Sequence, residues 1–336
     1  MYLHPCQKDL LRNCRVALIT GPAGSGKTIA ILLKIREIVQ ESTSSKIFIA
    51  ACYPHNIRLK HFLEQDGIEV SHISTLPASV TSPVVVMEMK DFLGQNEKRN
   101  FKRMTNNVQT TEFEDNCSYL LQQQFHVFID DIHEERKLEE NYSNGIKRLL
   151  TSANERSYVW IVYDQGQEHY SRQFLLDSVP TFRLPAVLRN TVEIYYFSLD
   201  ERYREMEFDR AKETVPGIAP GHNIHGSFIC SHALYQDRMP RLNQDSAPYL
   251  AFIRQVFIPE LCKLIQGSDA LPLSQLAVIC HVEGLRKLVK TEIDLKSIPN
   301  GTVEEQILSP NRIAVDVVKH FSSAEWMTVL IIGKSF

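Results

Sequence analysis

An octapeptide near the N-terminus, Gly21-Pro22-Ala23-Gly24-Ser25-Gly26-Lys27-Thr28, constrains the fold of this 336-residue chain more than any other feature. It matches the pattern G-x-x-x-x-G-K-[ST] at every fixed position. An apolar run at 16–20, typical of a buried parallel strand, precedes it, and an amphipathic helical pattern follows over 29–39. A strand, a glycine-rich turn and a helix N-terminus in this order form a cradle for phosphate groups.

The residue types in the octapeptide suit a nucleoside triphosphate. Glycines let backbone N–H groups turn inward without a clashing Cβ atom, so we expect all eight residues, Gly21 to Thr28, to line the nucleotide. Lys27 is expected to place its charge between the β- and γ-phosphates, and Thr28 to offer its hydroxyl to Mg²⁺. The alternative is a glycine-rich turn that only joins a strand to a helix.

A second candidate phosphate motif lies about a hundred residues further on. An apolar strand pattern at 125–129 ends in two carboxylates, Asp130 and Asp131. The C-terminal ends of parallel strands face one crevice, so Asp130 is expected near the metal, where it binds Mg²⁺ through water. Asp131 is then placed to orient or deprotonate the attacking water. A polar turn after a buried strand is the alternative.

Strand-like and helix-like segments alternate along the first half of the chain. Strands are predicted at 15–20, 46–51, 84–88, 125–130 and 157–163, and helices at 27–41, 55–64, 89–104, 114–123 and 143–154. The second half has helical patterns at 190–206, 249–266 and 283–290 and strand patterns at 275–280, 313–318 and 328–332. Such alternation predicts an α/β fold with parallel sheets flanked by helices, and the length favours two domains.

Bulk properties exclude several classes of protein. The formal charge is −3, so any nucleic-acid contact must come from a local groove rather than from a global basic field. The seven cysteines are scattered, which favours reduced intracellular thiols and argues against a disulfide framework or a zinc site. No apolar run approaches membrane-spanning length and the N-terminus is too polar for a signal peptide. We therefore expect an intracellular protein, cytoplasmic or nuclear, that makes no membrane contact.

Weaker motifs extend over the rest of the chain, at 158–167 (YVWIVYDQGQ), at 188–190 (LRN) followed by Ile194, and at 320–325 (HFSSAE). In order and spacing they resemble the motifs of superfamily 1 helicases, and most closely the helicase-like C-terminal region of Schlafen family proteins. That resemblance implies two tandem RecA-like P-loop NTPase domains. Residues 1–180 would carry the Walker A and Walker B motifs, and residues 181–336 would form a second domain that is incomplete at its C-terminus.

The resemblance also implies residue roles around bound ATP and Mg²⁺. Gln7 would bind the adenine edge, Gln167 would sense the γ-phosphate, Arg189 would act as an arginine finger, and Glu325 would contact the ribose. The alternatives are ordinary ones. Gln7 would be a surface residue of a short helix, Gln167 a turn residue, and Arg189 a helix N-terminal salt-bridge partner. Before Glu325, a serine and an alanine stand where the family has glycine and leucine.

Two departures from the resemblance bear on activity. Helicase-type NTPases usually carry Glu where Asp131 stands, and the shorter side chain reaches less far toward water, so hydrolysis is expected to be slow. The chain stops at Phe336, before a sixth motif that supplies another arginine. Three functions remain open: an ATP-driven nucleic-acid translocase or helicase, an ATP-binding regulatory or interaction module with little hydrolysis, and a small-molecule kinase. Oligomeric state stays open.

Single-stranded RNA or DNA is the expected partner of the first of these functions. The segment 98–103 mixes basic residues with a phenylalanine, as a strand-binding surface does, although a solvated helix face is the alternative. The segments 54–56 and 72–75 follow strands and are positioned like helicase contact loops. Trp160 and Trp326 lie in apolar patterns, so both are expected in the core.

Overall fold

The computed structural model describes 5–21, 24–42, 44–53, 55–76, 82–94, 106–130, 143–153, 155–164, 179–184, 186–187, 219–220, 246–266, 270–317 and 328–332. The chain separates into two compact units, Met1–Ile229 and Cys230–Phe336. The division at 180/181 that we derived from the sequence stays a prediction.

A parallel sheet of seven described strands forms the centre of the first unit. Its order is β3-β4-β2-β5-β6-β1-β7, and every strand pair in it is parallel. The strands are β1 (Val16–Gly21), β2 (Ile47–Ala51), β3 (Val70–Ile73), β4 (Val84–Glu88), β5 (His126–Asp130), β6 (Val159–Asp164) and β7 (Thr181–Arg183). Five of them were predicted. The sequence did not indicate β3 or β7, which are short edge strands with few buried residues.

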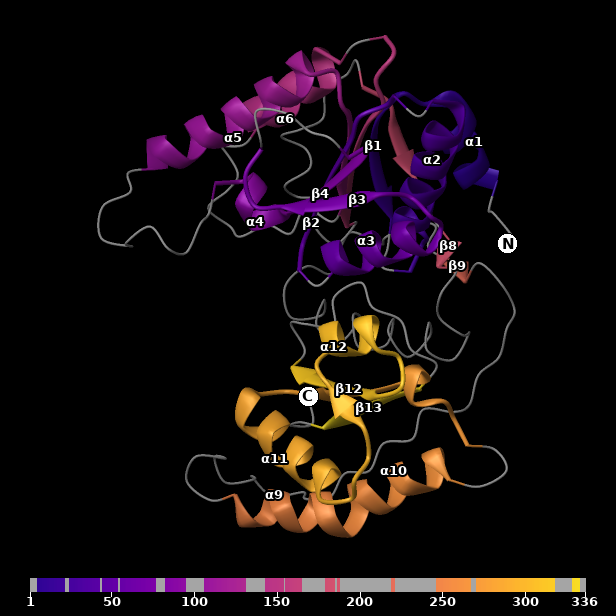
Figure 1. Ribbon diagram of the computed structural model, residues 1–336, viewed down its shortest axis with the longest axis vertical. Helices are drawn as coiled ribbons and strands as arrows, with labels where there is room; N and C mark the ends of the chain where they lie inside the picture. Colours follow the sequence, from indigo (N-terminus) through magenta and orange to yellow (C-terminus); the bar gives the residue numbers. More distant parts are fainter. Residues whose placement is uncertain are drawn as a thin grey trace, which may run out of the picture. The chain divides into compact units, whose positions relative to one another are not determined.

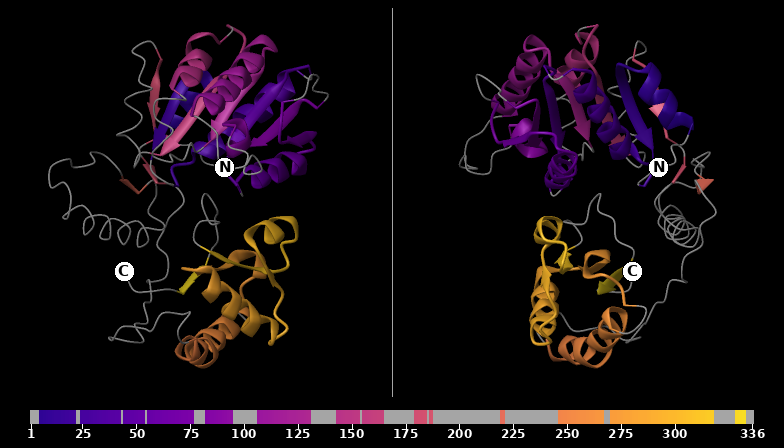
Figure 2. Two further views of the ribbon diagram at one scale, coloured as in Figure 1. Left: turned by 90° about the vertical axis from the view of Figure 1, so that its left-hand side faces the viewer. Right: turned by 45° about the vertical axis from the view of Figure 1, so that its right-hand side comes forward.

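Helices cover both faces of this sheet (Figures 1 and 2). They are α1 (Pro5–Asn13), α2 (Lys27–Glu41), α3 (His55–Gln65), α4 (Met89–Phe92), α5 (Asn106–Gln122) and α6 (Ser143–Thr151). The first three share one apolar core with the sheet, and the last three share the other. The helix predicted over 89–104 ends within the described residues at Phe92, because the chain turns at Gly94, whose φ is 74°.

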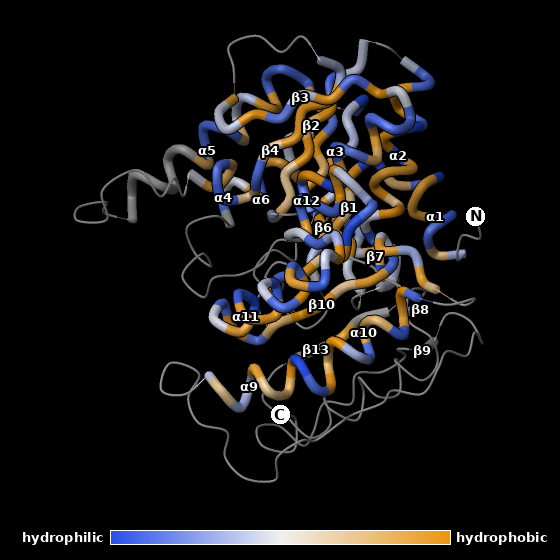
Figure 3. Tube along the Cα trace, turned by 60° about the horizontal axis from the view of Figure 1, so that its bottom comes forward, coloured by the Kyte–Doolittle hydropathy of each residue, from blue (hydrophilic) through white to orange (hydrophobic). Residues whose placement is uncertain are grey.

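The alternation of side chains along each strand divides the core into these two layers. In β2, Ile47 and Ile49 pack toward α1, α2 and α3, whereas Phe48 and Ala50 pack toward α4, α5 and α6. All four are fully buried, as expected for a central parallel strand that is covered on both faces. In Figure 3 the central strands of the sheet are mostly coloured hydrophobic, whereas the helices around them have mixed hydropathy.

The second unit contains a smaller parallel sheet in the order β11-β12-β10-β13. Its strands are β10 (Leu276–Cys280), β11 (Asn300–Gly301), β12 (Ile313–Val317) and β13 (Thr328–Ile332), and its helices include α9 (Ala247–Phe252), α10 (Ile258–Ile265), α11 (Glu283–Asp294) and α12 (Val303–Leu308). Helices α10 and α11 pack on one face and α12 packs on the other. The prediction of an α/β fold with parallel sheets flanked by helices is confirmed.

The helix predicted at 249–266 is interrupted by a π-helical turn, η2 (Ile253–Phe257), between α9 and α10. The Ile258 N–H donates to the Ile253 carbonyl, five residues back. Pro259 has no N–H to offer the carbonyl four residues before it, which accounts for the wider turn at this place. Arg254, on the π turn, makes two hydrogen bonds to Glu292 of α11, at 2.9 and 2.7 Å.

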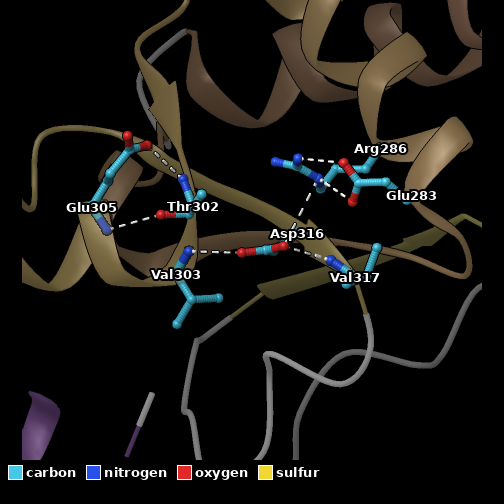
Figure 4. A network of polar contacts seen from close by, with 7 residues as sticks. All are labelled: Glu283, Arg286, Thr302, Val303, Glu305, Asp316 and Val317. Atoms are coloured by element: carbon cyan, nitrogen blue, oxygen red, sulfur yellow. Dashed lines mark hydrogen bonds and ion pairs between the residues drawn. The ribbon is translucent and has the colours of Figure 1, made fainter. Parts of the chain in front are cut away.

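Polar contacts fix the start of α12 against β12 (Figure 4). Thr302 accepts a hydrogen bond from the Glu305 N–H at 3.1 Å, and the Glu305 carboxylate accepts one from the Thr302 N–H at 2.8 Å. This is a capping box, which satisfies N–H groups that the helix itself leaves without a partner. The buried Asp316 of β12 accepts from the N–H groups of Val303 and Val317.

Two further findings bear on the sequence analysis. Cysteines 6, 14, 52, 117, 262 and 280 are free thiols, and Cys280 is fully buried, so burial raises its pKa to about 12. Among the described helices, none combines the length and the hydropathy that a membrane crossing requires.

Candidate phosphate-binding site

Two glycines give the loop between β1 and α2 its shape. Gly24 has a φ of 81° and Gly26 a φ of 83°, in the left-handed region that other residues rarely adopt. Gly26 immediately precedes the first residue of α2, Lys27. The N-terminus of this 15-residue helix therefore opens toward the loop, as in a site for an anion. Pro22 and Ala23 lie outside the described residues.

The space at Gly21 admits no side chain. A Cβ atom there would lie 2.5 Å from the Leu184 carbonyl oxygen and 2.8 Å from Ser25 Oγ. The Leu184 N–H donates to the Thr20 carbonyl at 2.8 Å, so the backbone that follows β7 is held against the end of β1. Gly21 is thus needed for the close approach of the backbone after β7 and of the Ser25 side chain to the end of β1.

Lys27 folds back over the loop that precedes it. Its Nζ atom donates a 2.7 Å hydrogen bond to the Gly21 carbonyl. The ammonium group of Lys27 therefore lies beside the loop and close to the N-terminus of α2. A positive charge and a helix N-terminus at one place favour a bound anion.

Gln7 supports the same loop from α1. Its Nε2 atom donates to the carbonyls of Ser25 at 3.4 Å and Gly26 at 3.3 Å. Only 1% of Gln7 is exposed, so it is not the surface residue that we considered as an alternative. The adenine-binding role of Gln7 stays a prediction.

Three side chains meet at the C-terminal edge of the sheet. The Thr28 hydroxyl donates a 2.9 Å hydrogen bond to Asp130 Oδ2. His55 Nε2 lies 2.6 Å from the same oxygen and 3.3 Å from Thr28 Oγ1. Asp130 is 1% exposed and His55 5% exposed, so the contacts are shielded from bulk water. The sequence predicted that Thr28 and Asp130 share a metal site, and the fold brings them together.

His55 is the residue that the sequence analysis did not assign to this site. It begins α3, four residues after Ala51, the last residue of β2. Ala51 is the register partner of Asp130 in the neighbouring strand β5. The sequence signal for His55 was its position: it is a polar residue just after β2, the strand that pairs with β5.

Buried polar atoms without a partner lie on the elements that build this site. Among the described residues they include Thr20 Oγ1 at the end of β1, Ser25 Oγ in the loop, His55 Nδ1 and Asn56 Oδ1. Buried polar groups are normally hydrogen-bonded, so each of these atoms calls for a ligand, a water or an ion. Hydroxyl and imidazole groups, together with Lys27 and Asp130, fit a phosphate group accompanied by a hard cation.

The two segments predicted as helicase contact loops, 54–56 and 72–75, differ in the burial of their side chains. His55 and Asn56 face the interior, and Asn56 Nδ2 lies 3.0 Å from His72 Nε2. The side chains of His55 and Asn56 are therefore committed to the interior, and the position of 54–56 as a helicase contact loop stays a prediction. His72, Ser74 and Thr75 are exposed.

Trp160 is fully buried, as predicted, and its Nε1–H donates to the Cys14 carbonyl at 3.1 Å. Register pairs Gly21 with Asp164, so β6 ends beside the loop, three residues before Gln167 in the sequence. Several predicted residues and segments lie outside the described residues, namely Asp131, Gln167, Arg189, Glu325, Trp326 and the segments 98–103 and 190–206.

Comparison with known proteins gives only distant likenesses. No family model and no curated protein matches the sequence. The DUF1998 helicase MrfA bound to DNA is 12% identical with a TM-score of 0.46, and the alignment covers 99% of this chain and 45% of that one. MrfA bound to DNA and AMPPNP is 13% identical with a TM-score of 0.45, covering 94% and 41%.

The Hef helicase domain of Pyrococcus furiosus is 11% identical with a TM-score of 0.34, covering 94% of this chain and 86% of that one. This chain spans less than half the length of the MrfA chains that it matches. Identities and scores at this level identify no family for the chain.

Proposed function

We propose that this chain binds ATP with Mg²⁺ at residues 21–28 and Asp130 and hydrolyses it as a helicase-like P-loop ATPase. The observation that carries the proposal is the meeting of Thr28 and Asp130, 2.9 Å apart, beside the loop that Lys27 covers. A glycine-rich turn that only joins a strand to a helix has no need of a carboxylate from a strand 102 residues away. The unpartnered hydroxyl of Ser25 supports the same reading.

Each residue of the site then has a physical task. Lys27, which now donates to the Gly21 carbonyl, would donate to phosphate oxygens instead. Asp130 accepts the hydrogen of the Thr28 hydroxyl, so the lone pairs of the Thr28 oxygen remain available to the cation. Mg²⁺ in such a site neutralises the charge that develops on the phosphates. Asp131 follows Asp130 directly and would orient the attacking water.

The proposal extends to the residues that only the resemblance assigns. Gln7 would bind adenine, Gln167 would sense the γ-phosphate, Arg189 would stabilise the charge of the transition state, and Glu325 would contact the ribose. Together they describe an ATP-dependent translocase or helicase of Schlafen type on single-stranded nucleic acid. The end of β6 beside Gly21 supports the part of Gln167, which lies three residues further along the chain.

A second function is favoured by one observation, the presence of Asp131 where helicase-type NTPases carry Glu. The side chain is one methylene shorter, so it reaches less far toward water. A chain with this feature would bind ATP and change conformation with little hydrolysis, as a regulatory or interaction module.

The rate of ATP hydrolysis with and without single-stranded DNA and RNA separates the two functions. Lys27→Ala and Arg189→Ala are the test variants, and Lys60→Ala, a half-buried lysine of α3 that pairs with Glu64, is the matched control. A rate that polynucleotide raises, and that both test variants lose, supports the motor. ATP binding with negligible, unstimulated turnover supports the regulatory module.

A further inference from the structure

His55 is the one residue of the Thr28–Asp130 site without an assigned task. Its side chain is buried between the start of α3 and the end of β5, with Nε2 2.6 Å from Asp130 Oδ2. The contact is short enough to hold the carboxylate in one orientation. Thr28 Oγ1 lies 3.3 Å from the same imidazole nitrogen, so the ring touches both residues that would face the cation.

The hydrogen-bonding capacity of Asp130 shows what this contact does. Oδ2 accepts from Thr28 and from His55, and a carboxylate oxygen has two lone pairs. With both lone pairs of Oδ2 occupied, the other oxygen of Asp130 is the one available to a cation or to its water. Without His55, the carboxylate would keep Thr28 as its partner but could rotate about that single contact.

The second nitrogen of the imidazole is also in the interior. Because Nε2 carries the hydrogen that is donated to the carboxylate, Nδ1 is left to make a contact of its own. Nδ1 is buried and has no partner. A residue retained only for packing would avoid such an atom, since burying an unpaired polar group is unfavourable.

We propose that His55 is a positioning residue for Mg²⁺, which acts through Asp130 by fixing the orientation of its carboxylate. The inference rests on the ATP–Mg²⁺ site proposed above and adds to it a residue from a third segment of the chain. Outer residues that orient metal-binding carboxylates typically change metal affinity by tenfold to a hundredfold when they are removed. Removal of His55 should therefore weaken the binding of Mg²⁺ and leave the binding of metal-free nucleotide unchanged.

The test compares two variants of similar size that differ in one donor. In His55→Gln, the side-chain amide can still donate to Asp130, whereas His55→Leu fills the space without a donor. Binding of a fluorescent ATP analogue is titrated with Mg²⁺ and, separately, in EDTA. We expect His55→Leu to need about tenfold more Mg²⁺ than the wild type, with unchanged affinity in EDTA, and His55→Gln to restore most of the difference.

His61→Leu is the control, because His61 lies on the exposed side of the same helix and contacts Gln65. Equal Mg²⁺ dependence in His55→Leu and His55→Gln would overturn the inference and leave the nucleotide site standing. Failure of the wild type to bind nucleotide would remove the proposed function itself. If His55→Leu does not fold, His55→Asn replaces it, since its shorter amide ends before Asp130.

Discussion

The Thr28 hydroxyl donates a 2.9 Å hydrogen bond to Asp130 Oδ2, although 102 residues separate the two in the sequence. One residue lies in the first turn of α2 and the other ends β5, so the parallel sheet is what brings them together. In this arrangement the Thr28 oxygen and the Asp130 carboxylate are available to a single cation.

Thr28→Val is therefore expected to weaken ATP binding in the presence of Mg²⁺ by about tenfold or more, because it removes a hydroxyl ligand without changing the size of the side chain. Thr28→Ser keeps the hydroxyl and is expected to bind nearly as the wild type does. Titration of a fluorescent ATP analogue into each variant measures the difference. Equal affinities of the valine and serine variants would contradict the assignment of Thr28.

Gly21→Ala is expected to destabilise the fold, since the new Cβ atom would lie 2.5 Å from the Leu184 carbonyl. The matched control is Gly67→Ala, where φ is +78° and nothing lies within 4 Å. Gly67→Ala should lower the free energy of unfolding by only about 1 kcal/mol, the cost of placing alanine at a positive φ. Gly21→Ala should lower the free energy of unfolding in urea by about 1–3 kcal/mol more. A Gly21→Ala chain no less stable than the control would show that β7 does not crowd the loop.

His126 makes stability depend on pH. Burial, with Arg15 and Lys34 nearby, lowers the pKa of His126 from its usual 6.5 to about 4. Its Nδ1 accepts from the Tyr158 N–H at 3.0 Å. Between these pKa values the unfolded chain binds the proton and the folded chain does not. The free energy of unfolding should therefore be greatest above pH 6.5 and fall as the pH drops toward 4.

As the pH falls toward 4, protonation of His126 should lower the free energy of unfolding by about 2 kcal/mol, after allowance for partial screening by solvent. His126→Asn cannot titrate, so urea unfolding at pH 7 and pH 5 should show a smaller difference for this variant than for the wild type. His61→Asn serves as the control, because the hydrogen bond of His61 to Gln65 is exposed. The same pH dependence in His126→Asn and wild type would count against a half-buried imidazole that stays neutral in the folded chain.

Thr302→Ala should loosen the start of α12, because it removes the side chain that accepts from the Glu305 N–H. Loss of such a cap costs about 1 kcal/mol, whereas Thr302→Ser keeps the hydroxyl and should be nearly neutral. Hydrogen exchange of the amides in α12, measured by mass spectrometry, should be faster in the alanine variant than in the serine variant. Identical exchange in both would show that the capping box does not stabilise this helix.

Whether a strand or helix can be predicted from the sequence depends on the length of its motif or apolar run. The strand β1, the loop and α2 follow from one fixed motif, and the long buried runs of β2, β4 and β5 indicate strands on their own. The strand β3 is not indicated in this way, because only Val70 of its four residues is buried. Its place comes from pairing with β4, a contact that no local pattern contains.

The site shows the same division. Lys27, Thr28 and Asp130 belong to recognisable motifs, so the roles proposed for them follow from the spacing of those motifs. His55 belongs to none, and a single histidine after a strand has many meanings. Only the register of Ala51 with Asp130 places His55 next to the carboxylate. For Gln7 the sequence allowed either an adenine-binding residue or a surface residue of a short helix. Its burial against the loop carbonyls excludes the surface residue.

The decisive experiment is equilibrium binding of ATP in the presence of Mg²⁺, measured by calorimetry on the wild type, Lys27→Ala and the control Lys60→Ala. We expect one ATP site in the wild type and in the control. The affinity of Lys27→Ala should be at least about a hundredfold lower, because the charge-assisted hydrogen bonds from Lys27 to phosphate are lost. Equal binding by all three chains, or no binding by the wild type, would refute the proposed ATP site.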